Sequence, residues 1–165
     1  MNGTDEVMAI LDGQQRMTSL YIALKGTYAY KLSYKRWDNP SAYPKRKMYL
    51  NLLSEAEEAD IMYDFQFLMD EEAENWTDDD GQYIEFWFPV GEILDFKEES
   101  DVNDYLVDNE LNIVKDKTKA KFANKALFKL FSVIHNKQTI SYYLEDSAEL
   151  DKVLNIIRKS IISLM

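Results

Sequence analysis

Residues 7–24 have the sequence VMAILDGQQRMTSLYIAL, in which one apolar run leads through Asp-Gly-Gln-Gln-Arg into a second. Val7 to Leu11 carries no charge and has the length of a buried strand, although periodicity alone does not distinguish it from a helix segment. After Arg16, apolar residues recur at the spacing of one helix face, at Met17, Leu20, Tyr21, Leu24 and Tyr28. Gly26 lies where such a helix would end. The stretch therefore predicts a strand, a glycine turn and a helix in succession.

The turn between the two runs has the residue types of an anion site. A helix that begins at a glycine turn presents backbone N–H groups without acceptors inside the helix, and these groups attract anions. Gly13 has no Cβ to hold an anion away from the backbone, and Arg16 offers a planar fork of donors that matches phosphate. The side chains of Gln14 and Gln15 add amide donors, and the hydroxyl of Thr18 follows one turn later. We therefore expect these five residues to bind phosphate.

Asp12 allows two interpretations. Its carboxylate could hold a Mg²⁺ ion that bridges to the phosphate, or it could orient a water. Asp12 is then an expected catalytic residue, together with Arg16 at the phosphate. Alternatively, Asp12 is a helix N-cap, and its spacing to Gln15 is that of a capping box. The residues of the turn leave both interpretations open.

The segment Ile10–Leu20, with Asp-Gly-Gln-Gln-Arg at its centre, resembles the GmrSD-type restriction endonuclease N-terminal family. Residues 63–68 and 86–94 also resemble this family, and the likeness covers most of residues 7–156. That family is similar to the ParB/sulfiredoxin fold, in which the equivalent turn binds a nucleotide. The resemblance implies a nucleoside triphosphate with Mg²⁺ as the ligand, and a nuclease module or subunit as a partner.

Relative to this family, we expect the chain to be truncated at both ends. An Arg-Pro-Tyr-x-Trp-like segment precedes the turn in the family, and a Phe-x-Arg-x-Asn-x-x-Gly stretch follows the equivalent of residues 154–156; neither is present in the sequence. The separate histidine-containing nuclease portion of the family is also missing, so no DNA cleavage is assigned to this chain. The expected organisation is a single, partial ParB-like domain over residues 1–165.

The composition indicates a folded protein without disulfides. The chain has 165 residues, 46% hydrophobic and 13% aromatic, which is enough to bury a core. It has no cysteine, which excludes disulfides and thiolate metal sites, and its one histidine, His135, cannot form a histidine-based nuclease centre alone. We expect His135 in the last turn of a helix, where a cation suits the helix dipole. No apolar run is long enough to span a membrane and no signal peptide follows Met1, so a cytoplasmic protein is expected.

The net charge of −11 is unevenly distributed. Residues 25–47 carry seven basic side chains against one acid, and residues 111–137 carry seven lysines against one acid. Residues 55–110 instead carry twenty-one acids against one lysine. The two basic segments are candidate DNA contacts, although charge runs of this kind also occur as simple solvated faces. In the first segment, aromatic and basic residues alternate; such aromatics either stack bases or pack the loop onto the body of the protein.

Hydrophobic periodicity predicts an α+β fold, with a small, mostly antiparallel sheet and helices packed on it. We expect strands at residues 48–53, 62–69 and 83–88, with residues 70–82 as an exposed hairpin connection. Helical segments are expected at residues 90–96, from Ser100 or Asp101 to Leu106, and at 118–136. A strand at 139–144 and a helix at 147–157 would follow.

The residues and the resemblance together favour nucleotide binding, with hydrolysis as a further expectation, in a modification-dependent DNA restriction system. The alternative is a non-enzymatic interaction module, either an inactive remnant or an acidic mimic of DNA, which the acids of residues 55–110 suggest. Binding of nucleotide that depends on Arg16 distinguishes the first hypothesis from the second.

Overall fold

The computed structural model describes residues 13–58 and 60–137. These residues fall into two compact units, residues 13–20 and residues 21–137, and helix α1 (Gln14–Leu24) includes the point of division. Of the elements in the described residues, the second unit holds the strands and the remaining helices. Within the described ranges, no helix is both long enough and apolar enough to span a lipid bilayer.

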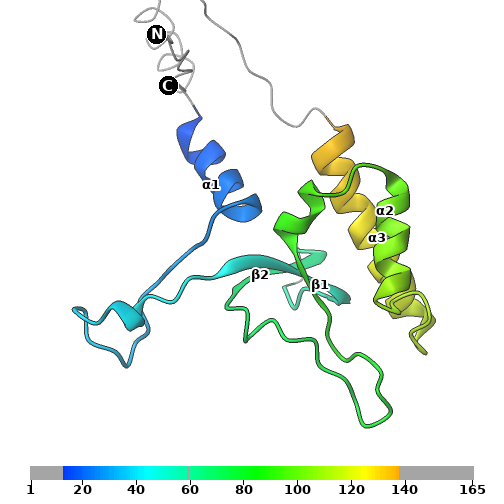
Figure 1. The fold of residues 1–165 in the computed structure, drawn as a ribbon, viewed down its shortest axis with the longest axis horizontal. Helices are drawn as coiled ribbons and strands as arrows, with labels where there is room; N and C mark the ends of the chain where they lie inside the picture. Colours follow the sequence, from blue (N-terminus) through cyan, green and yellow to red (C-terminus); the bar gives the residue numbers. More distant parts are fainter. Residues whose placement is uncertain (1–12, 59, 138–165) are drawn as a thin grey trace, which may run out of the picture. The chain divides into compact units, whose positions relative to one another are not determined.

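The sheet has three antiparallel strands in the order β2-β1-β3. Figure 1 labels two of them, β1 and β2. The strands are β1 (Lys47–Glu55), β2 (Tyr63–Leu68) and β3 (Trp87–Pro89). The central strand β1 pairs Leu50 with Phe65 on one side and with Phe88 on the other. Tyr49 to Leu53 are all buried. Four of these residues are apolar or aromatic, and the fifth, Asn51, is polar, with its side-chain oxygen accepting from the Leu53 amide at 3.0 Å.

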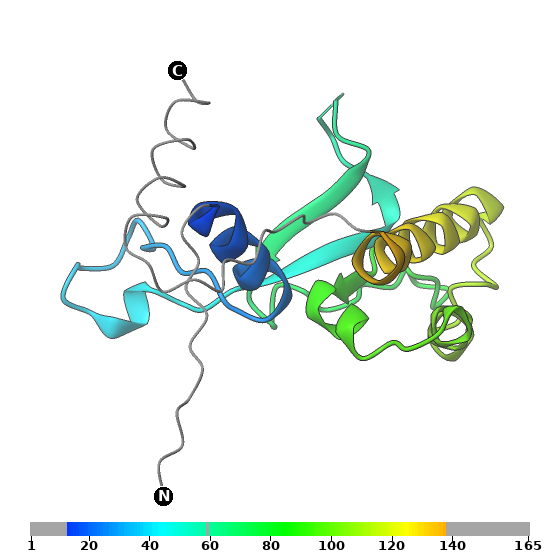
Figure 2. The same cartoon turned by 90° about the horizontal axis from the view of Figure 1, so that it is seen from above.

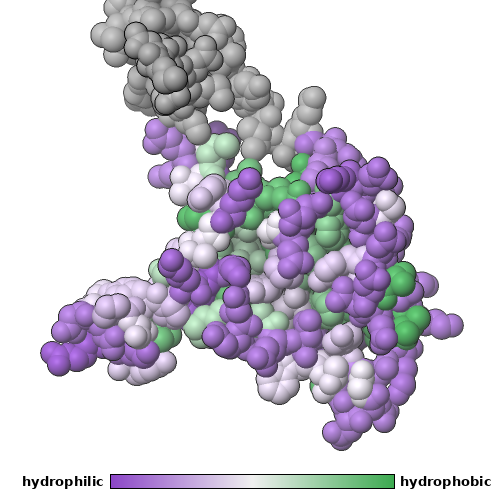
Figure 3. All heavy atoms as spheres, viewed as in Figure 1, coloured by the Kyte–Doolittle hydropathy of each residue, from purple (hydrophilic) through white to green (hydrophobic). Residues whose placement is uncertain are grey.

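Helix α3 (Lys117–Phe131) packs against β1 and against helix α2 (Glu99–Asp108), as Figures 1 and 2 show. Its apolar positions recur at helical spacing, and Ala123, Leu127 and Phe131 are buried. Asp116 caps α3 by accepting from the Thr118 amide at 2.8 Å. The core joins side chains from the sheet and both helices: Leu50, Leu52, Phe86, Phe88, Ile93, Val102, Leu106, Leu111, Leu127 and Phe131. Over α2 and α3, the visible surface is mainly hydrophilic (Figure 3).

Three short helical turns complete the described chain. Residues Pro40–Ala42 form η1, Val90–Leu94 form η2, and Ser132–Asn136 form a single π turn, η3, that continues from α3. The helix predicted at 118–136 therefore exists, but its last five residues change their hydrogen-bonding pattern. The expected α+β fold with an antiparallel sheet is confirmed.

The predicted hairpin between the second and third strands is wrong. β3 pairs with β1 and not with β2, so residues 70–82 cross from one edge of the sheet to the other. The segment instead closes a small hairpin of its own, in which Thr77 pairs with Tyr83 and Gly81 adopts φ +75°. The third strand is also shorter than the predicted 83–88, and it includes Pro89 opposite Tyr49. Proline is tolerated there because β3 is an edge strand.

Several predicted elements lie outside the described residues. These are the strand at Val7–Leu11, the strand at 139–144 and the helix at 147–157.

Candidate functional site

The glycine turn is followed directly by α1, as predicted. Gly13 adopts φ +75°, a left-handed conformation that costs most other residues free energy. Its carbonyl oxygen accepts a hydrogen bond from the Met17 amide at 3.0 Å, in the first turn of the helix. The turn therefore lies at the N-terminal end of α1, the end at which helices attract anions.

The Arg16 side chain folds back over this turn. A Cβ built on Gly13 would lie 3.5 Å from Nη2 of Arg16, so the guanidinium lies beside the glycine backbone. Arg16 is exposed, and no salt bridge joins it to another residue in the part of the chain that the structure describes. The turn therefore combines an accessible guanidinium with the positive end of a helix dipole.

The other predicted phosphate contacts surround the helix and do not all lie on one side. Gln14, Gln15 and Thr18 are exposed. Helical spacing places Thr18 one turn after Gln14 on the same face, whereas Arg16 begins from the opposite face and reaches Gly13 only by folding back. The backbone carbonyl of Gln15 accepts from the Ser19 hydroxyl at 2.9 Å, so Ser19 is engaged with its own helix. The structure thus brings Gly13 and Arg16 together, whereas Thr18 lies a full helical turn after Gln14.

Asp12, the predicted metal ligand, lies outside the described residues. Among the residues that are described, no cluster of three or more His, Cys, Asp or Glu could hold a metal ion.

Two hydrogen bonds and two glycines in close backbone contact, Gly26 and Gly91, fix the C-terminal end of α1. The amides of Lys25 and Gly26 both donate to the Tyr21 carbonyl at 2.8 Å, which ends the helix near the predicted glycine. A Cβ on Gly26 would lie 2.9 Å from the Ile22 Cα. The Leu24 carbonyl approaches Gly91 of η2 closely, and Leu24 packs against the main core. Sequence reasoning did not assign a role to Gly91, although it lies inside the family-like stretch 86–94.

The first basic segment forms a closed loop. We call residues 28–46 the aromatic loop; its two ends pair through Tyr28 and Arg46, whose amides and carbonyls exchange two 2.8 Å hydrogen bonds. Inside the loop, the Leu32 amide donates to the Ala42 carbonyl at 2.8 Å. Asn39 caps the η1 turn by accepting from the Ser41 amide. The loop extends away from the sheet in Figure 1, and in Figure 3 it is purple to pale, the colours of charged and weakly polar residues.

Arg46 at the base of the aromatic loop is buried, which sequence reasoning missed. Its side chain is 2% exposed, its Cζ lies 4.0 Å from the centre of the Tyr30 ring, and its Nε lies 3.7 Å from a carboxylate oxygen of Glu72. That Nε has no hydrogen-bond partner among the described residues. The burial of a guanidinium is tolerated because the aromatic face and the carboxylate both stabilise its charge. No local signal in the sequence separates Arg46 from its exposed neighbours.

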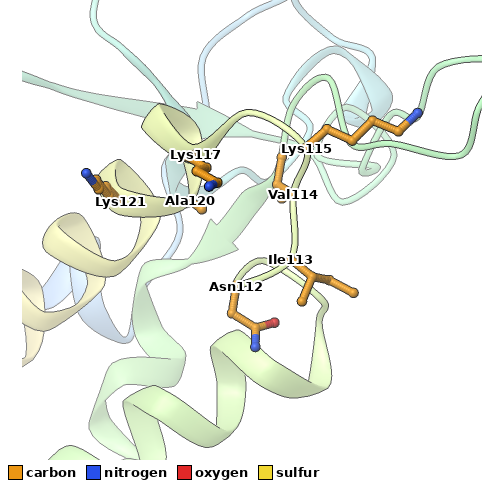
Figure 4. A pocket seen from close by; sticks show the side chains of 7 residues that line it. All are labelled: Asn112, Ile113, Val114, Lys115, Lys117, Ala120 and Lys121. Carbon is orange, nitrogen blue, oxygen red and sulfur yellow. The ribbon is translucent and has the colours of Figure 1, made fainter.

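The second basic segment contributes a row of lysines along α3. Lys117, Lys121, Lys125 and Lys129 are exposed and four residues apart, and the helix contains no acid. A shallow pocket of about 480 Å³ lies at the start of this row, where the α2–α3 loop meets α3 (Figure 4). The Lys115 side chain extends away from the other lining residues, which are Asn112, Ile113, Val114, Lys117, Ala120 and Lys121.

The fold brings parts of the acidic and basic segments together. Lys115 Nζ lies 2.9 Å from Asp80, and Lys47 Nζ lies 3.1 Å from Asp70. Asp70 also accepts from the Tyr49 hydroxyl at 2.8 Å, and its pKa is lowered, first by this hydrogen bond and then by Lys47. Burial and the Asp70 carboxylate raise the pKa of Tyr49 to about 12. Charges that are segregated in the sequence are thus partly paired in the fold.

His135 has a structural position. Its Nε2 lies 2.7 Å from the Ile93 carbonyl oxygen, and because a carbonyl only accepts, Nε2 donates its proton there. Its ring stacks on Phe131 with the centroids 4.6 Å apart. His135 therefore ties η3 to η2, in line with the expectation of a role at a helix end.

A family model described as the GmrSD restriction endonuclease, N-terminal domain, matches residues 1–159. No curated protein matches the chain. Because the matched residues cover nearly the whole sequence, the chain belongs to the GmrSD restriction endonuclease N-terminal domain family and is a module of a restriction system.

Proposed function

We propose that this chain binds a nucleoside triphosphate at the turn between Asp12 and α1, as part of a modification-dependent DNA restriction system. The observation that carries the proposal is the position of Arg16, whose exposed guanidinium lies beside Gly13 without an ion pair to a described residue. An unpaired guanidinium next to a helix N-terminus is an arrangement that binds phosphate. Membership of a restriction-enzyme family is compatible with such a ligand.

In this proposal each residue of the turn has one role. The backbone after Gly13 and the guanidinium of Arg16 hold phosphate oxygens, and the side chains of Gln14 and Gln15 donate to the same phosphates. Thr18, a turn further along, contacts a more distant part of the nucleotide. Asp12 binds Mg²⁺ or orients a water, and hydrolysis would need this residue. Mg²⁺ would neutralise phosphate charge and hold the phosphate oxygens in place.

DNA is the second proposed ligand, and it would contact the basic segments 25–47 and 111–137. The exposed row of α3 lysines supports this assignment, because lysines that neutralise successive phosphates supply most of the affinity in nonspecific binding. A nuclease module or subunit is the proposed protein partner, since the chain belongs to the N-terminal domain family of a restriction endonuclease. These ligands together describe a module that couples nucleotide binding to DNA recognition.

The direct test is a titration of the full 165-residue chain with labelled nucleoside triphosphates, with and without Mg²⁺. Arg16→Ala should weaken binding by about 10- to 100-fold, the usual effect of losing a charge-assisted hydrogen bond, and Arg16→Lys should weaken it less. Asp12→Asn should reduce the effect of Mg²⁺ on affinity. Arg36→Ala is the matched control, because Arg36 is an exposed arginine that pairs with Asp38 at 3.7 Å, outside the turn.

Two results would overturn the assignment. Nucleotide affinity that is unchanged in Arg16→Ala, or lost equally in Arg36→Ala, would show that the turn is not the site. Salt-sensitive binding to a basic partner protein, without nucleotide binding, would favour the acidic mimic instead. The three pairings of acids in residues 70–82 with Arg46, Lys47 and Lys115 favour an internal role for those acids.

A further inference from the structure

The aromatic loop displays large aromatic rings to solvent instead of burying them. Trp37 and Tyr34 are each 78% exposed, and Tyr30 is 49% exposed. Tyr28 is 46% exposed, and its ring lies 5.3 Å from Phe67 of β2, so it also helps to attach the base of the loop to the sheet. Exposed clusters of large apolar side chains usually mark a binding surface. The loop is therefore anchored at its base and carries unburied rings further out.

An ammonium group lies next to each of the two most exposed rings. Lys31 Nζ is 5.0 Å from the centre of the Trp37 ring, and Lys35 Nζ is 6.0 Å from the centre of the Tyr34 ring. Lys35 also donates to the Ser41 carbonyl at 3.0 Å, which holds its charge over the loop. The loop contains five basic residues against one acid, and that acid pairs with Arg36. Its ligand should therefore combine flat apolar groups with negative charge.

The loop is held in place by interactions that leave these rings uncovered. The two backbone hydrogen bonds between Tyr28 and Arg46 close it, and the buried Arg46 side chain links it to Tyr30 and Glu72. A platform that is ordered before binding loses less conformational entropy when it binds than a disordered segment does. The base of the loop is thus tied to the rest of the unit, while the rings of Trp37 and Tyr34 remain exposed.

We propose that the aromatic loop binds a single-stranded stretch of DNA, with unpaired bases stacked on Trp37 and Tyr34 and the flanking phosphates held by Lys31 and Lys35. Proteins commonly bind single-stranded nucleic acids with aromatic rings and cations side by side, because every base has a π face and every nucleotide carries a phosphate. Bases inside a duplex are stacked on each other and are not available to these rings. The proposal rests on the proposed function only for the choice of DNA as the polymer.

The test uses the full chain and a labelled thymidine oligomer of about 12 nucleotides, within the usual site size for such surfaces, with affinity measured by fluorescence anisotropy. We expect the single strand to bind about tenfold tighter than a blunt duplex of equal length. Trp37→Ala and Tyr34→Ala should each weaken binding by about tenfold or more, and Trp37→Phe should remain within about threefold of the original chain, because phenylalanine still stacks. A uridine oligomer should bind no more tightly than the thymidine oligomer.

Trp76→Ala is the matched control, since Trp76 is also an exposed tryptophan, at 63%, but lies in the acidic segment 70–82. Its affinity for the oligomer should equal that of the original chain. The proposal is overturned by equal affinity for duplex, by unchanged binding in Trp37→Ala, or by Trp37→Phe binding as weakly as Trp37→Ala. Tighter binding of the uridine oligomer would overturn the assignment to DNA.

The same variants separate this proposal from the nucleotide site. Arg16→Ala should bind the oligomer normally, and Trp37→Ala should bind nucleoside triphosphate normally. If the chain binds no nucleotide but still shows Trp37-dependent oligomer binding, only the proposed nucleotide site fails. If nucleotide binding depends on Arg16 but the oligomer does not depend on Trp37, only the stacking surface fails.

Discussion

The carbonyl oxygen of Leu24 lies 2.7 Å from the position that a Cβ on Gly91 would occupy. This approach joins the end of α1, the helix that begins at the candidate site, to the η2 turn of the family-like stretch 86–94. Gly91 needs no positive φ, so the requirement for glycine there is one of space. The end of α1 is therefore positioned by the absence of a side chain on its neighbour.

Gly91→Ala should destabilise the protein. The added methyl group would press on a backbone carbonyl that cannot rotate away, so α1 or η2 must shift, and overpacking of this kind costs about 1–3 kcal/mol. Urea denaturation would measure the loss in the free energy of unfolding. Hydrogen exchange at the Lys25 and Gly26 amides should also accelerate, since both donate to Tyr21 at the end of α1.

Gly81→Ala is the comparison for this variant. A Cβ on Gly81 would meet no atom within 4 Å, but Gly81 adopts φ +75°. Its replacement should therefore cost only local strain of about 1–2 kcal/mol and leave exchange at Lys25 and Gly26 unchanged. Accelerated exchange in both variants would contradict the role assigned to Gly91.

The two partners of the Arg46–Glu72 pair should respond unequally to mutation. Glu72→Gln keeps an oxygen that can accept from the Met69 amide, as Glu72 does at 2.9 Å, but it leaves the buried guanidinium without a counter-charge. We expect a loss of about 1–2 kcal/mol in the free energy of unfolding, reduced from typical buried pairs because Glu72 is half exposed. Arg46→Met leaves behind only a carboxylate that water can solvate, so it should cost less. Equal losses in the two variants would argue against a buried, charge-stabilised Arg46.

Glu92→Gln should stabilise the protein at neutral pH. Glu92 is an exposed residue, but partial desolvation of its carboxyl group, and then the nearby Asp95, raise its pKa above the ordinary value of 4.5 against an opposing effect of Lys47. A raised pKa in the folded state means that ionisation opposes folding, so the cost is absent below the ordinary pKa and is complete once the pH exceeds the raised pKa. Unfolding in urea at pH 7 should thus show a more stable variant, whereas at pH below 4.5 the two proteins should match. A variant that is less stable at pH 7 would show that Glu92 makes a favourable contact in its charged form.

Asp101→Asn should reduce the loss of stability in acid. The Asp101 carboxylate accepts from the Lys97 and Glu98 amides at 2.6 and 3.1 Å, and these bonds lower its pKa from the ordinary 3.8. A lowered pKa in the folded state gives stability that is present above the ordinary value and is lost as the pH falls through the folded value. Far-ultraviolet circular dichroism during acid titration should show a shallower loss of helix in the variant. An unchanged acid transition would mean that this cap contributes nothing to it.

Local sequence patterns were sufficient to predict most individual elements. The helices α1, α2 and α3 follow from apolar residues at helical spacing and from their flanking turn residues, and β1 and β2 follow from apolar and aromatic runs. The exposed turn with Arg16 beside Gly13 could also be anticipated, because both residues lie within one helical turn of each other. For such features, the interactions that decide the structure are between residues close in the sequence.

Pairings between distant residues could not be predicted in the same way. Pattern and turn residues suggested that the strand before residue 70 and the strand after residue 82 would be neighbours, yet both pair with β1. The sequence also did not show that Trp37 is exposed and Arg46 is buried, since aromatic and basic residues are interleaved throughout residues 28–46. Periodicity shows which face of a strand or helix is apolar, but it does not show which element will cover that face.

The sequence by itself thus determined the family, the α+β class and the candidate phosphate turn, because these depend on short motifs and local hydrogen bonding. Only the tertiary structure decided the strand order, the packing of Leu24 against Gly91 and the choice of which cations are buried or paired. Those outcomes depend on which distant segments exclude water from each other, and a residue such as Arg46 is buried only because Tyr30 and Glu72 are brought to it by the fold.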